Sequence, residues 1–298
     1  MPEQPTFEFL LPLFGDPELC RLAIASVLDQ THTNFRLTIV DDSYPQFPLA
    51  RYIRGLADPR VSYRQNDVAL GAGGNFRRVL SVASSERVTF MGSDDRLHPH
   101  YLAQVAALLS QYPEADIIQP GVRIIDAAGI PLMEMTDRAK RLLAPKISSQ
   151  PTLLEGEPLA ASLLRGNWSY FPSLMWRRSA ISAIGFREYD VVQDLGLLLD
   201  VVMSGGSMLV DPTLAFDYRR HAGSLSVIRA QTGARFDEER SYFNDVAKSL
   251  TALGWQRAAR SAKMRLASRL HAGSLAPRAL AAADINLARQ LLRHALGA

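Results

Sequence analysis

Cysteine is almost absent from this 298-residue sequence, in which Cys20 is the single example. One cysteine can build neither an internal disulfide framework nor a cysteine-based zinc site. We therefore expect a reducing compartment, because disulfides persist mainly in oxidising ones. We interpret Cys20 as a small core residue on a helix, since free cysteine usually packs as an apolar group.

Long apolar runs are also missing. No stretch reaches the roughly 18 uninterrupted apolar residues that indicate a membrane-spanning helix. The nearest candidate, residues 195–202, is interrupted by Asp200. The N-terminus carries Glu3 and Glu8 where a secretory signal peptide has a basic region. We expect a cytoplasmic protein, with the inner face of the membrane as the alternative.

The chain has little net charge. Lys and Arg number 33 and Asp and Glu 30, which gives +3, too small an excess to indicate a partner nucleic acid. Hydrophobic residues make up 47%, an ordinary value for one large or two modest globular domains. The one strong asymmetry lies in residues 254–298, where eight basic residues accompany a single acid, Asp284.

Short apolar segments alternate with helical patterns in the first hundred residues. We expect strands at residues 7–13, 37–40, 60–64 and 87–91. Helices are expected after the N-cap residue Asp16, at residues 52–56 and within residues 71–83. Strands that alternate with helices predict a mostly parallel sheet covered on both faces.

The pattern changes beyond residue 97. We expect helices at residues 99–112, 157–165 and 194–203, and strands at 116–119, 170–176, 207–210 and 214–218, with two more strands around residues 127–129. Residues 134–156 show no periodicity and are interpreted as a long mobile loop. From about residue 226 the chain is helical, with expected helices at 234–253, 255–271 and 276–296.

Acids and glycines gather where the first strands end. They are Asp41 and Asp42, then Asn66, Asp67 and the stretch 71–75, and finally Asp94 and Asp95. In an open parallel sheet, ligands bind beyond the carboxyl ends of the strands. Two adjacent carboxylates such as Asp94 and Asp95 suit Mg²⁺ or Mn²⁺, which complete their coordination with water and substrate phosphates. A turn or helix cap is the alternative for each acidic pair.

Other candidates are single residues. The glycine stretch has Phe76 where G-x-G-x-x-G ends in glycine, and it lacks Gly-Lys-Ser/Thr, so neither an NAD site nor a P-loop is supported. A helix N-terminus facing an anion remains open, with Arg77 near it. Asp194 opens a helix, where an acid in the first turn is the alternative. His221 follows two arginines that could face a pyrophosphate.

The ordered set of segments resembles the family 2 glycosyltransferases of the GT-A fold. The matching residues are 25–31, 38–43, 66–75, 92–95, 172–179, 193–194 and 219–226. The resemblance implies a Rossmann-like α/β domain over residues 1–226, with a nucleotide-binding half (1–96) and an acceptor half (97–226). Residues 227–298 then form a C-terminal helical extension.

The resemblance also implies roles for individual residues. The donor-binding set is Pro12, Leu13, Phe14, Asp42, Asn66, Gly71, Arg77 and Asp94. Asp95 would bind Mn²⁺ or Mg²⁺ at the donor diphosphate, with His221 near the metal, and Asp194 would be the catalytic base. One in-line displacement would then invert the anomeric carbon without a covalent enzyme intermediate.

The sequence departs from the family pattern at several positions. Ser93 stands where a first Asp is common, and Gln193 where Glu often precedes the base. These departures leave open a nucleotide-sugar-binding protein without turnover. A metal-dependent nucleotidyltransferase is the other alternative, although its Gly-rich Lys/Arg signature is missing near the first strand. No Gln-x-x-Arg-Trp motif is present, so we expect a non-processive enzyme.

The expected partners are a nucleotide-sugar donor and a glycan or lipid-linked acceptor, as in bacterial surface polysaccharide synthesis. UDP is the expected nucleotide, with GDP and dTDP as alternatives. Trp255, Ala259, Ala262, Leu266 and Leu270 share one helical face. We expect this face to pack as a cap on the catalytic domain or on a second subunit of a homodimer. Peripheral contact with an anionic membrane is the alternative.

Overall fold

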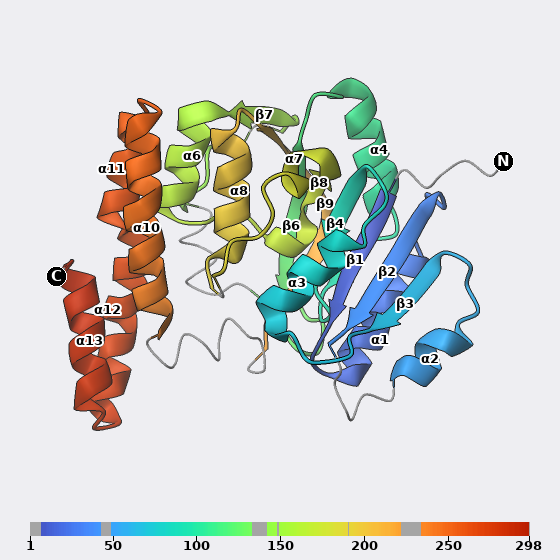
Figure 1. Cartoon of the computed structure of the whole chain (residues 1–298), viewed down its shortest axis with the longest axis horizontal. Coiled ribbons are helices and arrows are strands. Elements are labelled where there is room, and N and C mark those ends of the chain that lie inside the picture. The colour runs from blue at the N-terminus through green and yellow to red at the C-terminus, as the bar shows by residue number, and fades with distance from the viewer. Residues whose placement is uncertain are drawn as a thin grey trace.

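The computed structural model describes residues 7–42, 49–132, 142–147, 149–189, 191–221 and 234–297. These residues form a nine-stranded sheet of order β3-β2-β1-β4-β8-β6-β9-β5, with β7 also paired to β9 (Figure 1). The N-terminal elements are β1 (Phe7–Leu13), α1 (Pro17–Leu28), β2 (Phe35–Asp41), α2 (Leu49–Gly55), β3 (Val61–Gln65), α3 (Gly71–Ser81) and β4 (Arg87–Phe90).

The middle elements are β5 (Arg96–Leu97), α4 (Tyr101–Gln111), β6 (Ile117–Ile125), β7 (Thr152–Glu155), α6 (Gly156–Arg165), the 3₁₀ turn η1 (Phe171–Ser173), β8 (Met175–Arg177), α7 (Arg178–Ser182), α8 (Gln193–Met203) and β9 (Ser207–Arg219). The C-terminal helices are α10 (Ala234–Ala252), α11 (Gln256–Met264), α12 (Leu266–Ala281) and α13 (Ile285–Leu296).

The four N-terminal strands are parallel, as predicted. Leu13 of β1 is paired with Asp41 of β2, which is paired with Gln65 of β3. Three strands therefore end at the same level, and the polar residues that follow them emerge along one edge of the sheet.

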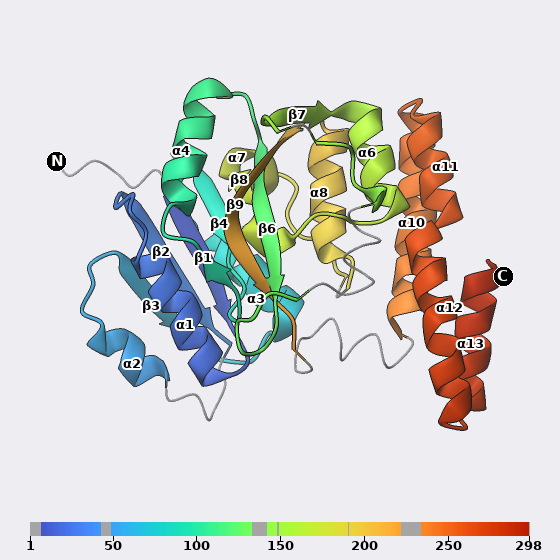
Figure 2. The same ribbon diagram turned by 180° about the vertical axis from the view of Figure 1, so that it is seen from behind.

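Each face of the sheet has its own hydrophobic core, because successive side chains of a strand point to opposite faces. Phe9 and Leu11 of β1 pack with α1 and α4 (Figure 2), whereas Leu10 joins the core that contains residues of α3, α6 and α8. Cys20 is fully buried in the first core, which confirms its interpretation as a core residue. Burial, with Asp94 and Asp16 nearby, raises the pKa of its thiol to about 12.

Two strands are longer than predicted. Residues 116–119 and 122–125 were expected in separate strands, but β6 runs through Gly121 with a shift in register. A Cβ on Gly121 would lie 2.5 Å from the carbonyl oxygen of Pro212, so only glycine lets the neighbouring backbone approach here. The two strands expected at 207–218 are likewise joined into β9, with Pro212 exposed within it.

Other differences are local. The strand expected after residues 127–129 is reduced to a bridge between Ile125 and Pro131. The region interpreted as a loop contains β7, which is paired with β9, while residues 133–141 and 148 lie outside the described part. The strand expected at 170–176 is replaced by η1, which has Pro172 in its first turn, and by the shorter β8.

The described residues 234–297 form four helices instead of the three predicted. The helix predicted over residues 255–271 is broken at Arg265, whose φ of 48° is left-handed, and Pro277 lies inside α12 instead of opening a helix. Helices α10 and α11 add Tyr242, Val246 and Ala259 to the core that holds α6 and α8. The predicted cap is therefore confirmed for its α11 part, whereas Leu266 and Leu270 of the same predicted face are exposed. Helices α12 and α13 pack together beyond them (Figure 1).

Candidate functional site

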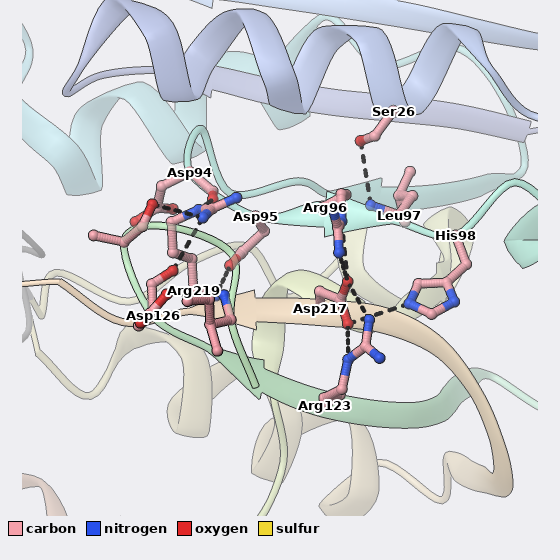
Figure 3. A network of polar contacts seen from close by, with 12 residues as sticks. Ser26, Asp94, Asp95, Arg96, Leu97, His98, Arg123, Asp126, Asp217 and Arg219 are labelled. Carbon is pink, nitrogen blue, oxygen red and sulfur yellow. Dashed lines mark hydrogen bonds and ion pairs between the residues drawn. The ribbon is translucent and has the colours of Figure 1, made fainter. Parts of the chain in front are cut away.

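Asp95 is the buried centre of the site. It follows β4 and is 1% exposed, and its Oδ1 accepts the backbone N–H of Arg219 over 2.8 Å (Figure 3). Burial and the neighbouring Asp94 carboxylate raise the pKa of Asp95 against the opposing effect of the Arg219 N–H. A buried carboxyl with so little compensation is well suited to a positive charge placed beside it.

Arg219 ties the acidic turn to the rest of the sheet. Its Nε donates to the carbonyl of Asp94 over 2.7 Å, and its Nη1 donates to the carbonyls of Asp126 and Ala127, each over 3.0 Å. The side chain is anchored in this way at the end of β9. Arg219 is one of the two arginines that could face a pyrophosphate, and in the structure its side chain holds the backbone of the acidic turn.

Asp94, Asp95 and His221 are the candidate ligands for a divalent cation. His221 Nε2 lies 2.9 Å from Asp94 Oδ2, and Asp95 is adjacent, so oxygen donors and an imidazole come together as Mn²⁺ and Mg²⁺ sites allow. Among the described residues, no group of three or more His, Cys, Asp or Glu is arranged to hold an ion by itself. A cation bound here would therefore take further ligands from substrate or water.

Ser93, noted above as a departure from the family pattern, joins the acidic turn to the end of β1. Its hydroxyl donates to the carbonyl of Pro12 over 3.0 Å and accepts the N–H of Phe14 over 3.2 Å. Phe14 is 42% exposed at the strand end, whereas the Leu13 side chain is 2% exposed and belongs to the core. Leu13 can therefore offer a ligand only its main chain.

Asp42 organises the turn before α3. Its Oδ1 accepts the Leu70 N–H over 2.7 Å and the Asn66 side-chain amide over 2.9 Å, and its Oδ2 accepts the Gly71 N–H over 2.8 Å. Asn66 also donates to Asn75, the last residue of the predicted stretch 71–75. The structure thus brings three predicted residues together: Asp42, Asn66 and Gly71. Among the described residues, no hydrogen bond or ion pair joins the exposed Arg77 to them.

Asp194 lies in the first turn of α8 and is held by its neighbours. Its Oδ1 accepts the Leu195 N–H over 2.7 Å, and its Oδ2 is 3.5 Å from Asn167 Nδ2. Asn167 is itself oriented by Ser169, whose N–H and hydroxyl both donate to Asn167 Oδ1. The amide nitrogen of Asn167 is therefore the atom that faces Asp194.

The turn that leads into α8 is held from the C-terminal helices. Glu238 of α10 accepts the N–H of Val191 over 2.6 Å and that of Val192 over 3.0 Å. The sequence gives no signal for Asn167 or Glu238, because each acts through a contact with a distant segment.

Tyr218 connects the two acidic regions. Burial raises the pKa of its phenol, and the carboxylates of Asp95, Asp94 and Asp194 raise it further. The turn after β4 and the start of α8 are thus both near enough to Tyr218 for their acids to act on its charge. Of the predicted motifs, residue 43 and residues 222–226 lie outside the described part of the chain.

A buried charge cluster supports the strand beside the acidic turn. Asp217 of β9 is fully buried, with Arg96 of β5, Arg123 of β6 and His98 around its carboxylate (Figure 3). Burial alone would raise the pKa of Asp217, but hydrogen bonds from Arg123 and Arg96, together with the His98 imidazole 3.2 Å away, outweigh it and lower the pKa to about 2. Asp217 thereby fastens β5, which directly follows Asp95, to β9 and β6.

Comparison with known sequences relates the N-terminal half of the chain to glycosyltransferases. Residues 9–150 match the family model described as glycosyl transferase family 2. The putative colanic acid biosynthesis glycosyl transferase WcaA of Escherichia coli K12 is 28% identical over 149 residues, 48% of this chain and 53% of that protein. The succinoglycan biosynthesis protein ExoW of Rhizobium meliloti is 29% identical over 163 residues, 52% of this chain and 49% of that protein.

The chain thus spans about half the length of these two relatives. A third relative is the E. coli UDP-Glc:α-D-GlcNAc-diphosphoundecaprenol β-1,3-glucosyltransferase WfgD. It is 29% identical over 86 residues, which cover 29% of this chain and 34% of that protein. Among solved structures, residues 1–349 of Staphylococcus aureus TarS in complex with UDP-GlcNAc have a TM-score of 0.61 at 14% identity, covering 96% of this chain and 90% of that one. This likeness confirms the predicted fold.

Proposed function

Residues 9–150 belong to the family 2 glycosyltransferases, and the chain has the GT-A fold. From this premise we propose that the protein transfers a sugar to an acceptor hydroxyl with inversion of the anomeric configuration. The donor in this proposal is a nucleotide-diphosphate sugar. The reaction would serve bacterial surface glycan synthesis, the process named for WcaA and ExoW.

The observation that carries the proposal is that carboxylates of two separate segments act electrostatically on one buried side chain, Tyr218. Asp94 and Asp95 come from the turn after β4, and Asp194 comes from the first turn of α8. Transfer needs one group of acids for the donor diphosphate and a separate carboxylate for the acceptor proton. The arrangement of these acids supports a donor role for Asp94 and Asp95 and an acceptor role for Asp194.

At the donor side, Asp95 and Asp94 with His221 would hold a divalent cation against the diphosphate. The cation supplies charge neutralisation as the leaving group becomes more negative. The turn held by Asp42, together with the exposed Phe14, would border the nucleotide at the ends of β1 and β2. Ser93 keeps the end of β1 and the acidic turn at a fixed separation.

At the acceptor side, Asp194 would take the proton of the attacking hydroxyl as its oxygen forms a bond to the anomeric carbon. The bond from that carbon to the diphosphate oxygen breaks on the opposite side. Configuration is therefore inverted and no covalent enzyme intermediate forms. The Asn167 amide, which faces Asp194 Oδ2, would keep the carboxylate directed toward the acceptor.

UDP is the nucleotide that we propose. Two observations support it: TarS, which shares the fold, binds UDP-GlcNAc, and WfgD is described as using UDP-Glc. WfgD is also described as acting on a diphosphoundecaprenol-linked sugar, which supports a lipid-linked glycan as one class of acceptor.

The proposal is tested by thermal unfolding with UDP, GDP and dTDP, each with and without Mn²⁺. A nucleotide at about 100 times its Kd adds about 2.7 kcal/mol of stability. We expect an Mn²⁺-dependent rise with UDP that disappears in Asp95→Asn and is kept in Asp245→Asn, a control on the exposed side of α10. Absence of any nucleotide effect would overturn donor binding.

Turnover separates the remaining alternatives. With a UDP-sugar and a glycan acceptor, Asp194→Asn should retain the UDP-dependent stabilisation and lose product formation. Stabilisation without turnover in the unsubstituted protein, across acceptors of both classes, would favour a binding protein. Release of pyrophosphate from a nucleoside triphosphate would favour a nucleotidyltransferase.

A further inference from the structure

Arg265 is a buried cation whose Nε and Nη1 have no partner among the described residues. It lies between α11 and α12, is 9% exposed, and has a left-handed backbone with φ of 48°. Its Nε and Nη1 are buried, and neither donates a hydrogen bond to any described residue. Burying an unpaired charge costs free energy, so binding of an anion beside this guanidinium would stabilise the folded protein.

Two acids of α10, Glu239 and Asp237, already have partners. Glu239 Oε1 accepts Arg235 Nε over 2.7 Å, and Glu239 Oε2 accepts the hydroxyl of Ser268. Asp237 forms an ion pair with Arg240 over 2.8 Å. Neither acid supplies a counter-charge to Arg265 among the described residues.

The groups that do face Arg265 are positive. Burial lowers the pKa of Arg265, and the guanidinium groups of Arg240 and Arg269 lower it further. Arg269 is anchored by its Nε, which donates to the carbonyl of Ala295 over 2.9 Å, and its terminal nitrogens lie beside Gly297. The guanidinium groups of Arg240 in α10 and Arg269 in α12 are thus near enough to Arg265 to act on its charge.

We propose that Arg265, with Arg269 and Arg240, forms a binding site for a phosphate group. The planar guanidinium donates paired hydrogen bonds that match phosphate oxygens, and several such groups together favour a multiply charged anion over chloride. The site lies in the C-terminal helices, apart from the sheet edge that carries Asp95 (Figure 1). It is therefore separate from the diphosphate site proposed above.

The surroundings suit a phosphate carried by a lipid headgroup as well as a free one. Met264, Leu266 and Leu270, which flank Arg265 and Arg269 in sequence, are 56%, 38% and 63% exposed. Exposed apolar side chains beside a basic site are typical of proteins that contact an anionic membrane surface.

The first experiment compares thermal unfolding of the full chain in sodium phosphate and in sodium chloride at equal ionic strength. We expect phosphate to raise the Tm by about 2–5 °C. Arg265→Met should abolish this rise and, in chloride, should unfold at the same temperature as the unsubstituted protein or above it. Arg260→Met, which removes an exposed arginine of α11, is the matched control and should keep the phosphate effect.

A phosphate effect that persists in Arg265→Met would overturn the proposal, because the anion would then act elsewhere, for instance at the donor site. A lower Tm of Arg265→Met in chloride would also contradict an unpaired charge. If Arg265→Met does not fold, Arg269→Met provides the same comparison. Co-sedimentation with phosphatidylcholine vesicles, with and without phosphatidylglycerol, then identifies where the bound phosphate group comes from. Vesicle binding that depends on Arg265 indicates a lipid headgroup, and its absence indicates free phosphate.

Discussion

Gly92 and Asp95 are in direct contact, and a Cβ on Gly92 would overlap Asp95 Oδ2 while lying 3.0 Å from the carboxyl carbon. Because Asp95 is buried and held by Arg219, its carboxylate cannot move aside without losing that hydrogen bond. We expect Gly92→Ala to weaken Mn²⁺-dependent UDP binding about tenfold or more, a difference of about 1.4 kcal/mol. Titration of the nucleotide by calorimetry measures this.

Gly55→Ala is the control for that substitution, since a Cβ at Gly55 meets no atom within 4 Å. The same UDP affinity in Gly92→Ala and Gly55→Ala would contradict a role for the exact position of the Asp95 carboxylate.

Asn167 orients the proposed base, so its loss should affect turnover more than donor binding. We expect Asn167→Ala to lower kcat about tenfold and to leave the KM for the UDP-sugar unchanged. Steady-state kinetics measure both constants, with Asn286→Ala on the exposed side of α13 as the control. A raised KM with an unchanged kcat would instead assign Asn167 to the donor.

Glu238 links the C-terminal helices to the base through two N–H groups at the start of α8. Glu238→Ala should leave those N–H groups without their acceptor and cost about 1–3 kcal/mol of unfolding free energy. We also expect faster hydrogen exchange at Val191 and Val192 and a lower kcat, with partial recovery in Glu238→Gln. Unchanged exchange at these two amides would show that Glu238 does not hold the turn.

Ionisation of Asp217 makes the free energy of unfolding depend on pH at the acidic end of the scale. Its pKa falls from 3.8 to about 2 on folding, so the ionised form stabilises the folded protein. The contribution, about 2 kcal/mol, is present above pH 4 and is lost as the pH falls toward 2. Urea unfolding should therefore show Asp217→Asn to be less stable at pH 7, with a difference that narrows between pH 4 and pH 2. A constant difference across this range would contradict the assignment.

The N-terminal half could be predicted well from the sequence because its signals are local. Apolar strands end in Asp42 and in Asp94, glycines and Asp16 mark helix starts, and parallel pairing follows from the alternation. The structure has all four strands and places Asp42, Asn66 and Gly71 together.

The second half could be predicted less well because distant pairing overrides local breaks. Pro120 and Pro212 suggest strand ends, yet β6 and β9 continue through them by pairing with each other. Arg219, Asn167 and Glu238 gain their roles only when remote segments meet, and no pattern in their neighbours indicates this. Asp95, Asp194 and His221 remain predictions as functional residues, now with a geometry to test.

The hydrogen bond between Arg219 and Asp95 joins residues 124 positions apart. During synthesis, the turn after β4 therefore leaves the ribosome long before the strand that anchors it. A nascent chain that ends before β9 has its acidic residues but not the backbone N–H that fixes them. Donor binding cannot assist the early steps of folding, and contacts so distant in sequence are expected to form slowly.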